Sequence, residues 1–144
     1  MAHTALLAAA LITSGLLAHD AAAGPAQDYI LYCMGCHGPE AQGVPGKVPP
    51  LAGILGRFMR TAAGRNYVLR VPGAANSALA DAQLAAVLNW LTERYGAPGE
   101  PPPAPFTQQE VAAVRRTPLA DVLATRREVV GELATSGAAP AAQY

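Results

Sequence analysis

The only two cysteines of this 144-residue chain stand close together in the run Cys33-Met34-Gly35-Cys36-His37. Each cysteine sulfur can form a thioether with one vinyl group of a haem, and the two-residue spacer lets both sulfurs reach the same macrocycle. The adjacent histidine then lies beneath the iron and can donate an imidazole nitrogen to it. The run therefore predicts one covalently bound haem c, with Cys33 and Cys36 as attachment points and His37 as an axial ligand of the iron.

Two other kinds of site use similar residues, and both fit this chain poorly. A structural zinc site wants four ligands, and the other histidines, His3 and His19, fall in a segment that we predict is removed on export. A thioredoxin-like dithiol would be expected between a strand and a helix of a βαβ unit, and the chain has no such pattern. A chance match to the motif is the remaining alternative.

Helical spacing surrounds the motif. Tyr29, Tyr32, Cys33 and Cys36 follow one another at three or four residues, which predicts a helix that ends at the motif. Residues 38–50 are dense in glycine and proline, so we expect a loop there. Further helices are predicted at 51–63, where Gly64 would end the helix, at 66–71 and at 81–95.

The segment after residue 96 changes in character. A proline-rich stretch, 97–106, is typical of a stiff and extended linker. Thr107 and Glu110 then have the spacing of a capping box, with Phe106 and Val111 placed as its hydrophobic staple. The predicted organisation is a signal peptide at 1–23, a haem domain at 24–96, the linker at 97–106, a helical extension at 107–135 and a tail without regular structure at 136–144.

The helical extension needs a surface for its apolar side. A second helix within it is predicted to start at Thr117-Pro118 and to carry Leu119, Val122, Leu123, Val130 and Leu133 on one side. Isolated helices of this length are marginal in water. We expect the extension to lie outside the core of the haem domain and to cover either the outside of that domain or a partner protein.

Residues 1–23 have the features of an export signal. An apolar run is followed by Ala21-Ala22-Ala23, small residues of the kind that a signal peptidase reads, although the first residues lack lysine and arginine. A transmembrane anchor is the alternative, but the apolar run is shorter than the roughly 20 residues that span a bilayer. We therefore expect cleavage after Ala23 and a periplasmic protein.

Three segments together resemble the class I c-type cytochromes. They are the motif with the residues that precede it from Tyr29, Val48-Pro-Pro-Leu-Ala-Gly, and the helical run that begins at Asp81 and contains Trp90. The resemblance covers residues 24–96. It implies an all-α cytochrome c fold of about four helices around one covalently bound haem, with the first and last helices crossing. The helical extension would be added to this fold.

The resemblance also implies roles for residues outside the motif. In the family, the carbonyl of a proline after the motif accepts a hydrogen bond from Nδ1 of the axial histidine, and Pro50 is the candidate here. Such a bond orients the imidazole and makes it a stronger donor to iron. A pair of loop prolines without this role is the alternative.

The sixth iron ligand is where this chain departs from the family. Most members place a methionine in the loop before the C-terminal helix, but residues 71–80 contain neither methionine nor histidine. Met59 is a candidate sixth ligand, although a buried methionine could equally fill a gap in the core. Asn76 is a candidate for the distal wall, with a turn residue as the alternative. An open or water-bound sixth position is a further hypothesis.

The chain has 10 basic and 10 acidic residues, a balance that argues against nucleic acid as a partner. Four arginines in the haem domain could pair with haem propionates, steer an acidic redox partner or simply form a solvated face: Arg57, Arg60, Arg65 and Arg70.

The first hypothesis is an electron carrier between a periplasmic dehydrogenase and a terminal acceptor, not an enzyme, because no nucleophile–base pair is evident. A haem protein that binds a small gaseous ligand at an open distal site is the second hypothesis. A fixed cytochrome subunit of a larger dehydrogenase complex is the third.

Overall fold

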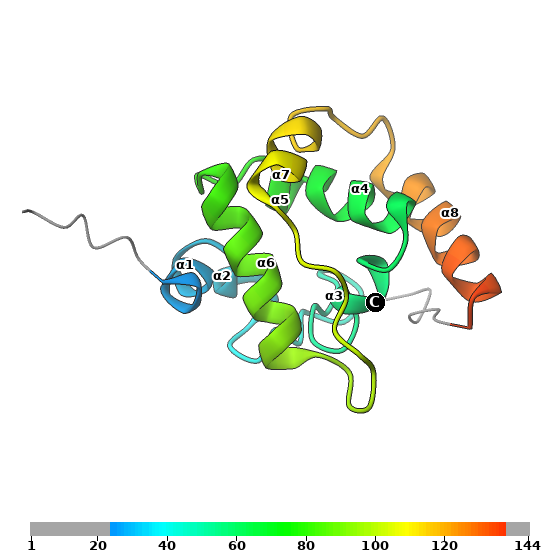
Figure 1. Ribbon diagram of the computed structural model, residues 1–144, viewed down its shortest axis with the longest axis horizontal. Coiled ribbons are helices and arrows are strands. Elements are labelled where there is room, and N and C mark those ends of the chain that lie inside the picture. Colours follow the sequence, from blue (N-terminus) through cyan, green and yellow to red (C-terminus); the bar gives the residue numbers. More distant parts are fainter. Residues whose placement is uncertain (1–23, 138–144) are drawn as a thin grey trace, which may run out of the picture.

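The computed structural model describes residues 24–137, which form the helical body drawn in colour in Figure 1. The predicted export signal at 1–23 and residues 138–144 of the predicted tail lie outside the described residues. The described part contains eight helices: α1 (Pro25–Tyr32), α2 (Met34–His37), α3 (Leu55–Phe58), α4 (Ala62–Arg70), α5 (Pro72–Ala75), α6 (Asp81–Tyr95), α7 (Gln108–Val114) and α8 (Val122–Thr135). The prediction of an all-α fold is confirmed. Between residues 24 and 137, no helix combines the length and the apolar character needed to cross a membrane.

Helices α1 and α6 pack against each other, as the resemblance implied for the first and last helices of the haem domain. Tyr29 is 2% exposed, and its ring lies 5.7 Å from that of Trp90. The side chain of Gln83 donates a hydrogen bond to the buried carboxylate of Asp28. The apolar stripe of α6 therefore faces inward, and α1 places the haem motif beside it.

The predicted helix at 51–63 is in fact two elements, α3 and the start of α4. Thr61 is the N-cap of α4, and its hydroxyl accepts a hydrogen bond from the backbone N–H of Gly64. Gly64 therefore lies in the first turn of α4, and the expectation that it ends a helix is wrong. A side chain at this position would overlap the carbonyl group of Phe58, so glycine is what lets α4 approach the end of α3.

The C-terminal segment contains both predicted helices, but the second starts later than expected. The hydroxyl of Thr107 accepts a hydrogen bond from the N–H of Glu110, which confirms Thr107 as the N-cap of α7. The Glu110 carboxylate pairs with Arg65 in place of the reciprocal bond of the predicted capping box. Helix α8 begins at Val122, where the Asp121 carboxylate accepts the N–H of Ala124 at 2.8 Å. The predicted start at Thr117-Pro118 is wrong because an aspartate cap is available further along the chain.

The expectation that these helices lie outside the core of the haem domain is also wrong. Helix α7 packs against α6 and α4, and α8 packs against α3 and α4 on the outer side of the body (Figure 1). Their buried side chains belong to the same hydrophobic cluster as Leu69 and Leu91. The members from the C-terminal segment are Phe106, Val111, Val129, Val130 and Leu133. Residues 24–133 thus contribute to one core.

Four arginines hold the proline-rich segment and the extension against the haem domain. Arg57 and Arg60 pair with Glu100, and Arg65 pairs with Glu110. Three of these arginines also donate to main-chain carbonyl groups: Arg60 to Pro101, Arg65 to Ala104 and Pro105, and Arg70 to Thr117 and Pro118. A chain rich in proline lacks many of the N–H groups that would pair with its own carbonyls, and a guanidinium carries five N–H donors.

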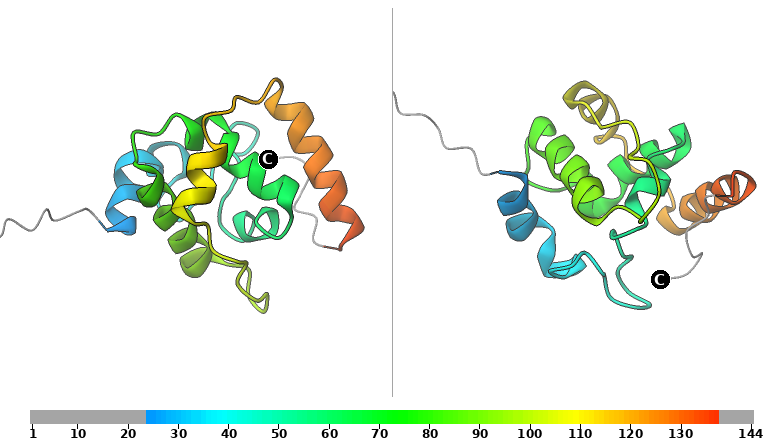
Figure 2. Two further views of the ribbon diagram at one scale, coloured as in Figure 1. Left: turned by 45° about the horizontal axis from the view of Figure 1, so that its top comes forward. Right: turned by 60° about the horizontal axis from the view of Figure 1, so that its bottom comes forward.

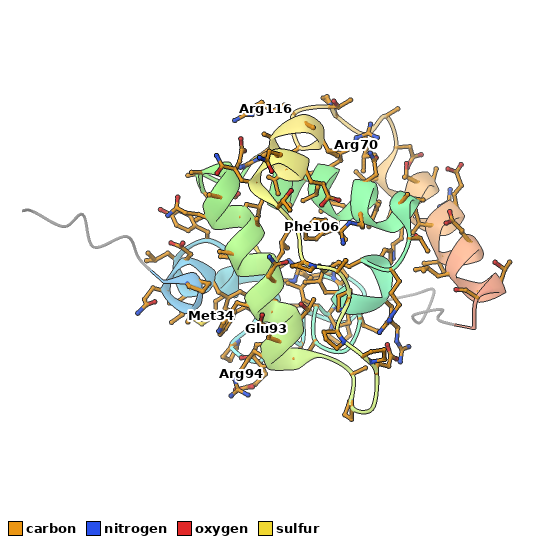
Figure 3. The ribbon with its side chains drawn as sticks, in the orientation of Figure 1. Met34, Arg70, Glu93, Arg94, Phe106 and Arg116 are labelled. Carbon is orange, nitrogen blue, oxygen red and sulfur yellow. The ribbon has the colours of Figure 1, made fainter. Side chains whose placement is uncertain are left out.

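Figure 3 places Arg70 beside the segment that joins α7 to α8, and Phe106 between α4 and α6. The Arg65 guanidinium lies 4.2 Å from the centre of the Phe106 ring. The four arginines therefore serve the packing of this chain against itself and do not form merely a solvated face. Their pairing with haem propionates and the steering of an acidic redox partner stay predictions.

Gly64→Ala is expected to destabilise the protein by about 1–3 kcal/mol, because the added methyl group would push α4 away from the carbonyl of Phe58. Gly131→Ala is the matched control: its methyl group would meet nothing within 4 Å, and alanine in this helix should stabilise by about 0.5–1 kcal/mol. Denaturant unfolding measures both. Equal changes in the two variants would contradict the proposed close approach of α3 and α4.

Candidate haem-binding site

A cavity of about 360 Å³ lies between the haem motif and the helices of the core. Cys33, Cys36 and His37 all line it, so the structure brings the three motif residues together on one wall. The remaining walls are largely apolar and come from α3, α4 and α6; they include Leu55, Phe58, Val68, Leu84, Leu88 and Leu91. An apolar cavity with a few convergent polar groups is typical of a cofactor site.

The motif adopts a single helical turn. Helix α2 begins directly after Cys33, whose carbonyl accepts the N–H of His37 at 3.0 Å. Gly38 then ends the turn with a φ of 78°, a conformation that favours glycine. Cys33 is half-buried and Cys36 is exposed, so the wall that carries the thiols reaches from the interior to the surface. Burial raises the pKa of the Cys33 thiol, and the Asp28 carboxylate adds to this effect.

The His37 ring is oriented by a backbone carbonyl group. Its Nδ1 lies 3.0 Å from the carbonyl oxygen of Pro49, so Nδ1–H donates and Nε2 keeps a free lone pair for a metal. Burial lowers the pKa of His37, which favours the neutral ring, while the bond to Pro49 partly opposes this effect. The acceptor is therefore Pro49 and not Pro50, although Pro50 does line the cavity.

The loop after the motif explains why the acceptor is Pro49. The N–H of Gly43 donates to the carbonyl of His37 at 2.8 Å, and Val44 pairs with Val48 in an isolated bridge. This bridge brings the carbonyl of the next residue back to the imidazole ring. The sequence cannot distinguish between two adjacent prolines as the acceptor, because the folded loop determines which carbonyl faces the imidazole ring.

The structure does not bring either candidate for the distal side to the cavity wall. Met59 is 2% exposed and belongs to the hydrophobic cluster, but it is not among the described residues that line the cavity. It therefore fills the core, which was the alternative interpretation. Asn76 is exposed at the end of α5 and does not line the cavity either, so its predicted place in the distal wall is wrong. Neither a methionine nor a second histidine is found among the described residues of the wall.

Arg115 is a residue whose importance the sequence did not reveal. It comes from the end of α7, is 5% exposed, and holds the loop in which the family places its methionine. Its guanidinium donates to the carbonyls of Leu79 at 2.8 Å and Ser77 at 2.9 Å, and it pairs with Asp81 at 3.0 Å. These contacts join residues more than thirty positions apart, and no local pattern predicts them.

No model of a known protein family matches the chain. Cytochrome c-552 of Thermus thermophilus is 33% identical to it over a 118-residue alignment that covers 67% of this chain and 90% of the relative. The chain belongs to the c-type cytochromes. A second cytochrome c-552, from a particular strain of the same species, has the same identity and is covered over 80% of its length. The relatives are thus matched over most of their length.

A c-type cytochrome holds a haem by thioethers, and the cavity fits such a group. The two thiols and the oriented imidazole lie on one wall, and the apolar side chains of α3, α4 and α6 face them. Cys33 and Cys36 would carry the macrocycle, and His37 would bind the iron through Nε2. Because Cys36 is exposed, a haem attached there would have one edge near the surface.

Tyr29 stabilises the end of the motif through a hydrogen bond. Its hydroxyl donates a hydrogen bond of 2.6 Å to the carbonyl of Gly38, the residue that ends α2. Burial raises the pKa of this hydroxyl to about 12, with the nearby Cys33 adding to the effect. The folded protein therefore favours the protonated phenol. The stability that this preference provides is complete below about pH 10 and is lost as the pH rises toward about 12.

Tyr29→Phe is expected to destabilise the protein by about 1 kcal/mol at neutral pH, because it removes a buried hydrogen bond. The difference in the free energy of unfolding between the variant and the wild type should shrink near about pH 11. At that pH the phenol of Tyr29 ionises more readily in the unfolded wild-type chain than in the folded one, which lowers the stability of the wild type. Denaturant unfolding at both pH values measures this. Tyr32→Phe, at a side chain that is 47% exposed, is the control and should change little. A deficit that stays constant with pH would contradict the raised pKa.

Proposed function

We propose that this c-type cytochrome is an exported, class I, mono-haem electron carrier that passes single electrons between a periplasmic dehydrogenase and a terminal acceptor. The observation that carries the proposal is the placement of Cys33, Cys36 and His37 on one wall of an apolar cavity, with His37 oriented by Pro49. The relatives named cytochrome c-552 support it. We propose no enzymatic activity for the chain.

The residues of the site each have a part in this function. The haem, when bound, supplies an Fe(III)/Fe(II) couple at its iron. Cys33 and Cys36 would hold the macrocycle, and His37 would bind its iron. The apolar walls would keep water away from the iron, and the exclusion of water is one of the factors that set a reduction potential.

The surface next to the motif suits the approach of a redox protein. Ile30 is 53% exposed, Leu31 is 68% exposed and Tyr32 is 47% exposed, all within α1 and directly before Cys33. Exposed apolar groups in one place favour a protein–protein contact. A partner that docks there would come close to the edge of the haem that Cys36 leaves near the surface.

A second function remains a candidate because of the distal side of the cavity. Without a methionine or a second histidine on the described wall, the sixth position of the iron could take up a small gaseous ligand. The idea of a fixed subunit in a larger dehydrogenase complex rested on an extension that docks on a partner. In the structure, the extension packs on its own chain, so its apolar side no longer argues for a partner subunit.

Covalent attachment predicts that acid-acetone extraction leaves the haem on the polypeptide, with one haem per chain in a pyridine haemochrome assay. Cys33→Ala and Cys36→Ala should each impair attachment, because each removes one thioether. His37→Ala should prevent a normal low-spin spectrum. Haem that is extracted from the intact wild-type protein would contradict the proposal.

Electron transfer predicts a reversible one-electron titration and fast exchange with small redox proteins. Met59→Leu should leave the visible spectrum unchanged and cost less than about 1.5 kcal/mol, because Met59 packs in the core. The near-infrared band of a methionine ligand should be absent in the wild type. Rapid binding of carbon monoxide together with slow electron exchange would contradict the electron-carrier function and favour the ligand-binding function.

A further inference from the structure

The segment between α4 and α6 forms one wall of the haem cavity, and a buried side chain fastens it. The residues of this segment that line the cavity have short side chains or none: Val71, Pro72, Gly73, Ala74 and Ser77. Arg115, the C-cap residue of α7, is 5% exposed and is not among the residues that line the cavity. It therefore contacts this wall from behind and not through the cavity.

The guanidinium of Arg115 donates hydrogen bonds of 2.8–3.3 Å to successive main-chain carbonyls of the segment, those of Ala74, Ala75, Ser77 and Leu79. The carboxylate of Asp81, which begins α6, pairs with the guanidinium at 3.0 Å and compensates its charge. A buried carbonyl that loses its donor costs free energy, so these bonds oppose a movement of the segment. The wall is thus fixed in place by a residue from outside the segment.

Ser77 is the residue of this wall whose side chain can form hydrogen bonds, since the other wall residues of the segment are apolar. Its hydroxyl donates to the carbonyl of Ala74 at 3.0 Å and accepts a hydrogen bond from Arg115 at 3.2 Å. A hydroxyl has one proton to donate, and this proton is already used. The wall therefore offers a ligand in the cavity neither a charge nor an available side-chain donor.

This wall lies away from the imidazole that would bind the iron. His37 belongs to α2, which packs on α1, whereas α5, within the segment, packs on α4. The right-hand view of Figure 2 shows α2 (cyan) toward the lower edge of the body and α7 (yellow), the helix that precedes Arg115, toward the upper edge. In an iron bound by Nε2 of His37, the sixth position points away from the imidazole. The wall of residues 71–77 is placed to face that position.

We propose that Arg115 is a positioning residue: by fixing the wall of residues 71–77, it limits the sixth position of the iron to small ligands such as carbon monoxide and excludes larger ones such as imidazole. The inference rests on the proposed binding of haem. The polarity of the distal pocket, its donors and the access that it allows decide what a haem iron takes up. A wall of short side chains leaves space for a diatomic molecule, and a wall that is held in place does not retreat for a five-membered ring.

The experiment compares Arg115→Gln with Arg116→Gln in the full-length holoprotein. Both arginines pair with Asp81, but the side chain of Arg116 is 71% exposed. Imidazole is titrated against the ferric protein and carbon monoxide against the ferrous protein. Arg115→Gln should raise the affinity for imidazole by about tenfold, because the segment loses the bonds that hold it, and should change the affinity for carbon monoxide by less than about threefold. Arg116→Gln should leave both affinities within about twofold of the wild type, since an exposed ion pair contributes little.

Two further variants separate positioning from a general loss of stability. Thr107→Ala removes the N-cap bond of α7, so it weakens the helix that carries Arg115 without touching the segment. It should leave the affinity for imidazole at the wild-type value. Arg115→Lys keeps the charge beside Asp81 but loses the planar fork of donors, so it should restore only part of the discrimination against imidazole.

The vibrational spectrum of bound carbon monoxide tests the wall directly, and it serves where Arg115→Gln fails to fold. The C–O stretching frequency reports the polarity beside the ligand. Ser77→Ala removes the hydroxyl of the wall together with its bonds to Ala74 and Arg115, so it should shift this frequency and raise the affinity for imidazole. Ser136→Ala is the matched control, because Ser136 donates to the carbonyl three residues before it, as Ser77 does, but lies at the end of α8. It should change neither quantity.

A haem content assay separates this inference from the proposed function. Wild-type protein without covalent haem would overturn the proposed function itself. With full haem content, an equal affinity for imidazole in Arg115→Gln and Arg116→Gln would overturn the inference alone, as would an equal gain in Thr107→Ala or a Ser77→Ala variant that behaves like the wild type. A wild-type iron that binds neither carbon monoxide nor imidazole would also overturn it, because the chain would then supply the sixth ligand itself. The electron-carrier function would stand in each of these cases.

Discussion

The bond between Nδ1 of His37 and the carbonyl of Pro49 is the contact on which the site depends, because it determines the direction of the imidazole ring. It spans twelve residues of a loop that has almost no regular structure, so the loop must be held by other means. The Val44–Val48 bridge and the hydrogen bond from the N–H of Gly43 to the carbonyl of His37 fix the loop on one side. The hydroxyl of Tyr29 fixes its start by donating to the carbonyl of Gly38. The site is thus held by a small set of hydrogen bonds that main-chain carbonyls accept, two of them from the side chains of His37 and Tyr29.

The C-terminal extension is a part of the haem domain and not an appendage to it. A short helical domain that surrounds a large cofactor has few side chains left to cover its outer surface, and α7 and α8 add buried apolar groups such as Phe106 and Leu133. The arginines of α3, of α4 and of the turn between them have a separate role. They donate hydrogen bonds to main-chain carbonyls of the proline-rich segment, where the prolines have no N–H groups to offer.

The described residues that line the cavity include neither a methionine nor a second histidine, in contrast to the pattern that the resemblance to class I cytochromes implies. The loop before α6 is short and is fastened by Arg115, so it presents small groups such as Ala74 and Ser77 to the cavity. The axial ligands are among the strongest influences of a protein on its haem. The same fold can therefore serve electron transfer or ligand binding, and the difference lies in what occupies one position on the iron.

A covalent haem site could be predicted from the sequence alone, because the spacing Cys33-x-x-Cys36-His37 needs no tertiary context to be recognised. The helical class and the bounds of α6 were also local properties, set by a 3.6-residue period and by the breakers around it. The choice of Pro49 over Pro50, the burial of Met59 in the core and the exposure of Asn76 were decided by the tertiary structure. Each depends on which groups face one another across the fold, and the contacts of Arg115 and Arg126 join segments that are separated by dozens of residues. A long-range contact of this kind leaves no periodic signal in the sequence, since its free energy is released only when the chain has closed around the cavity.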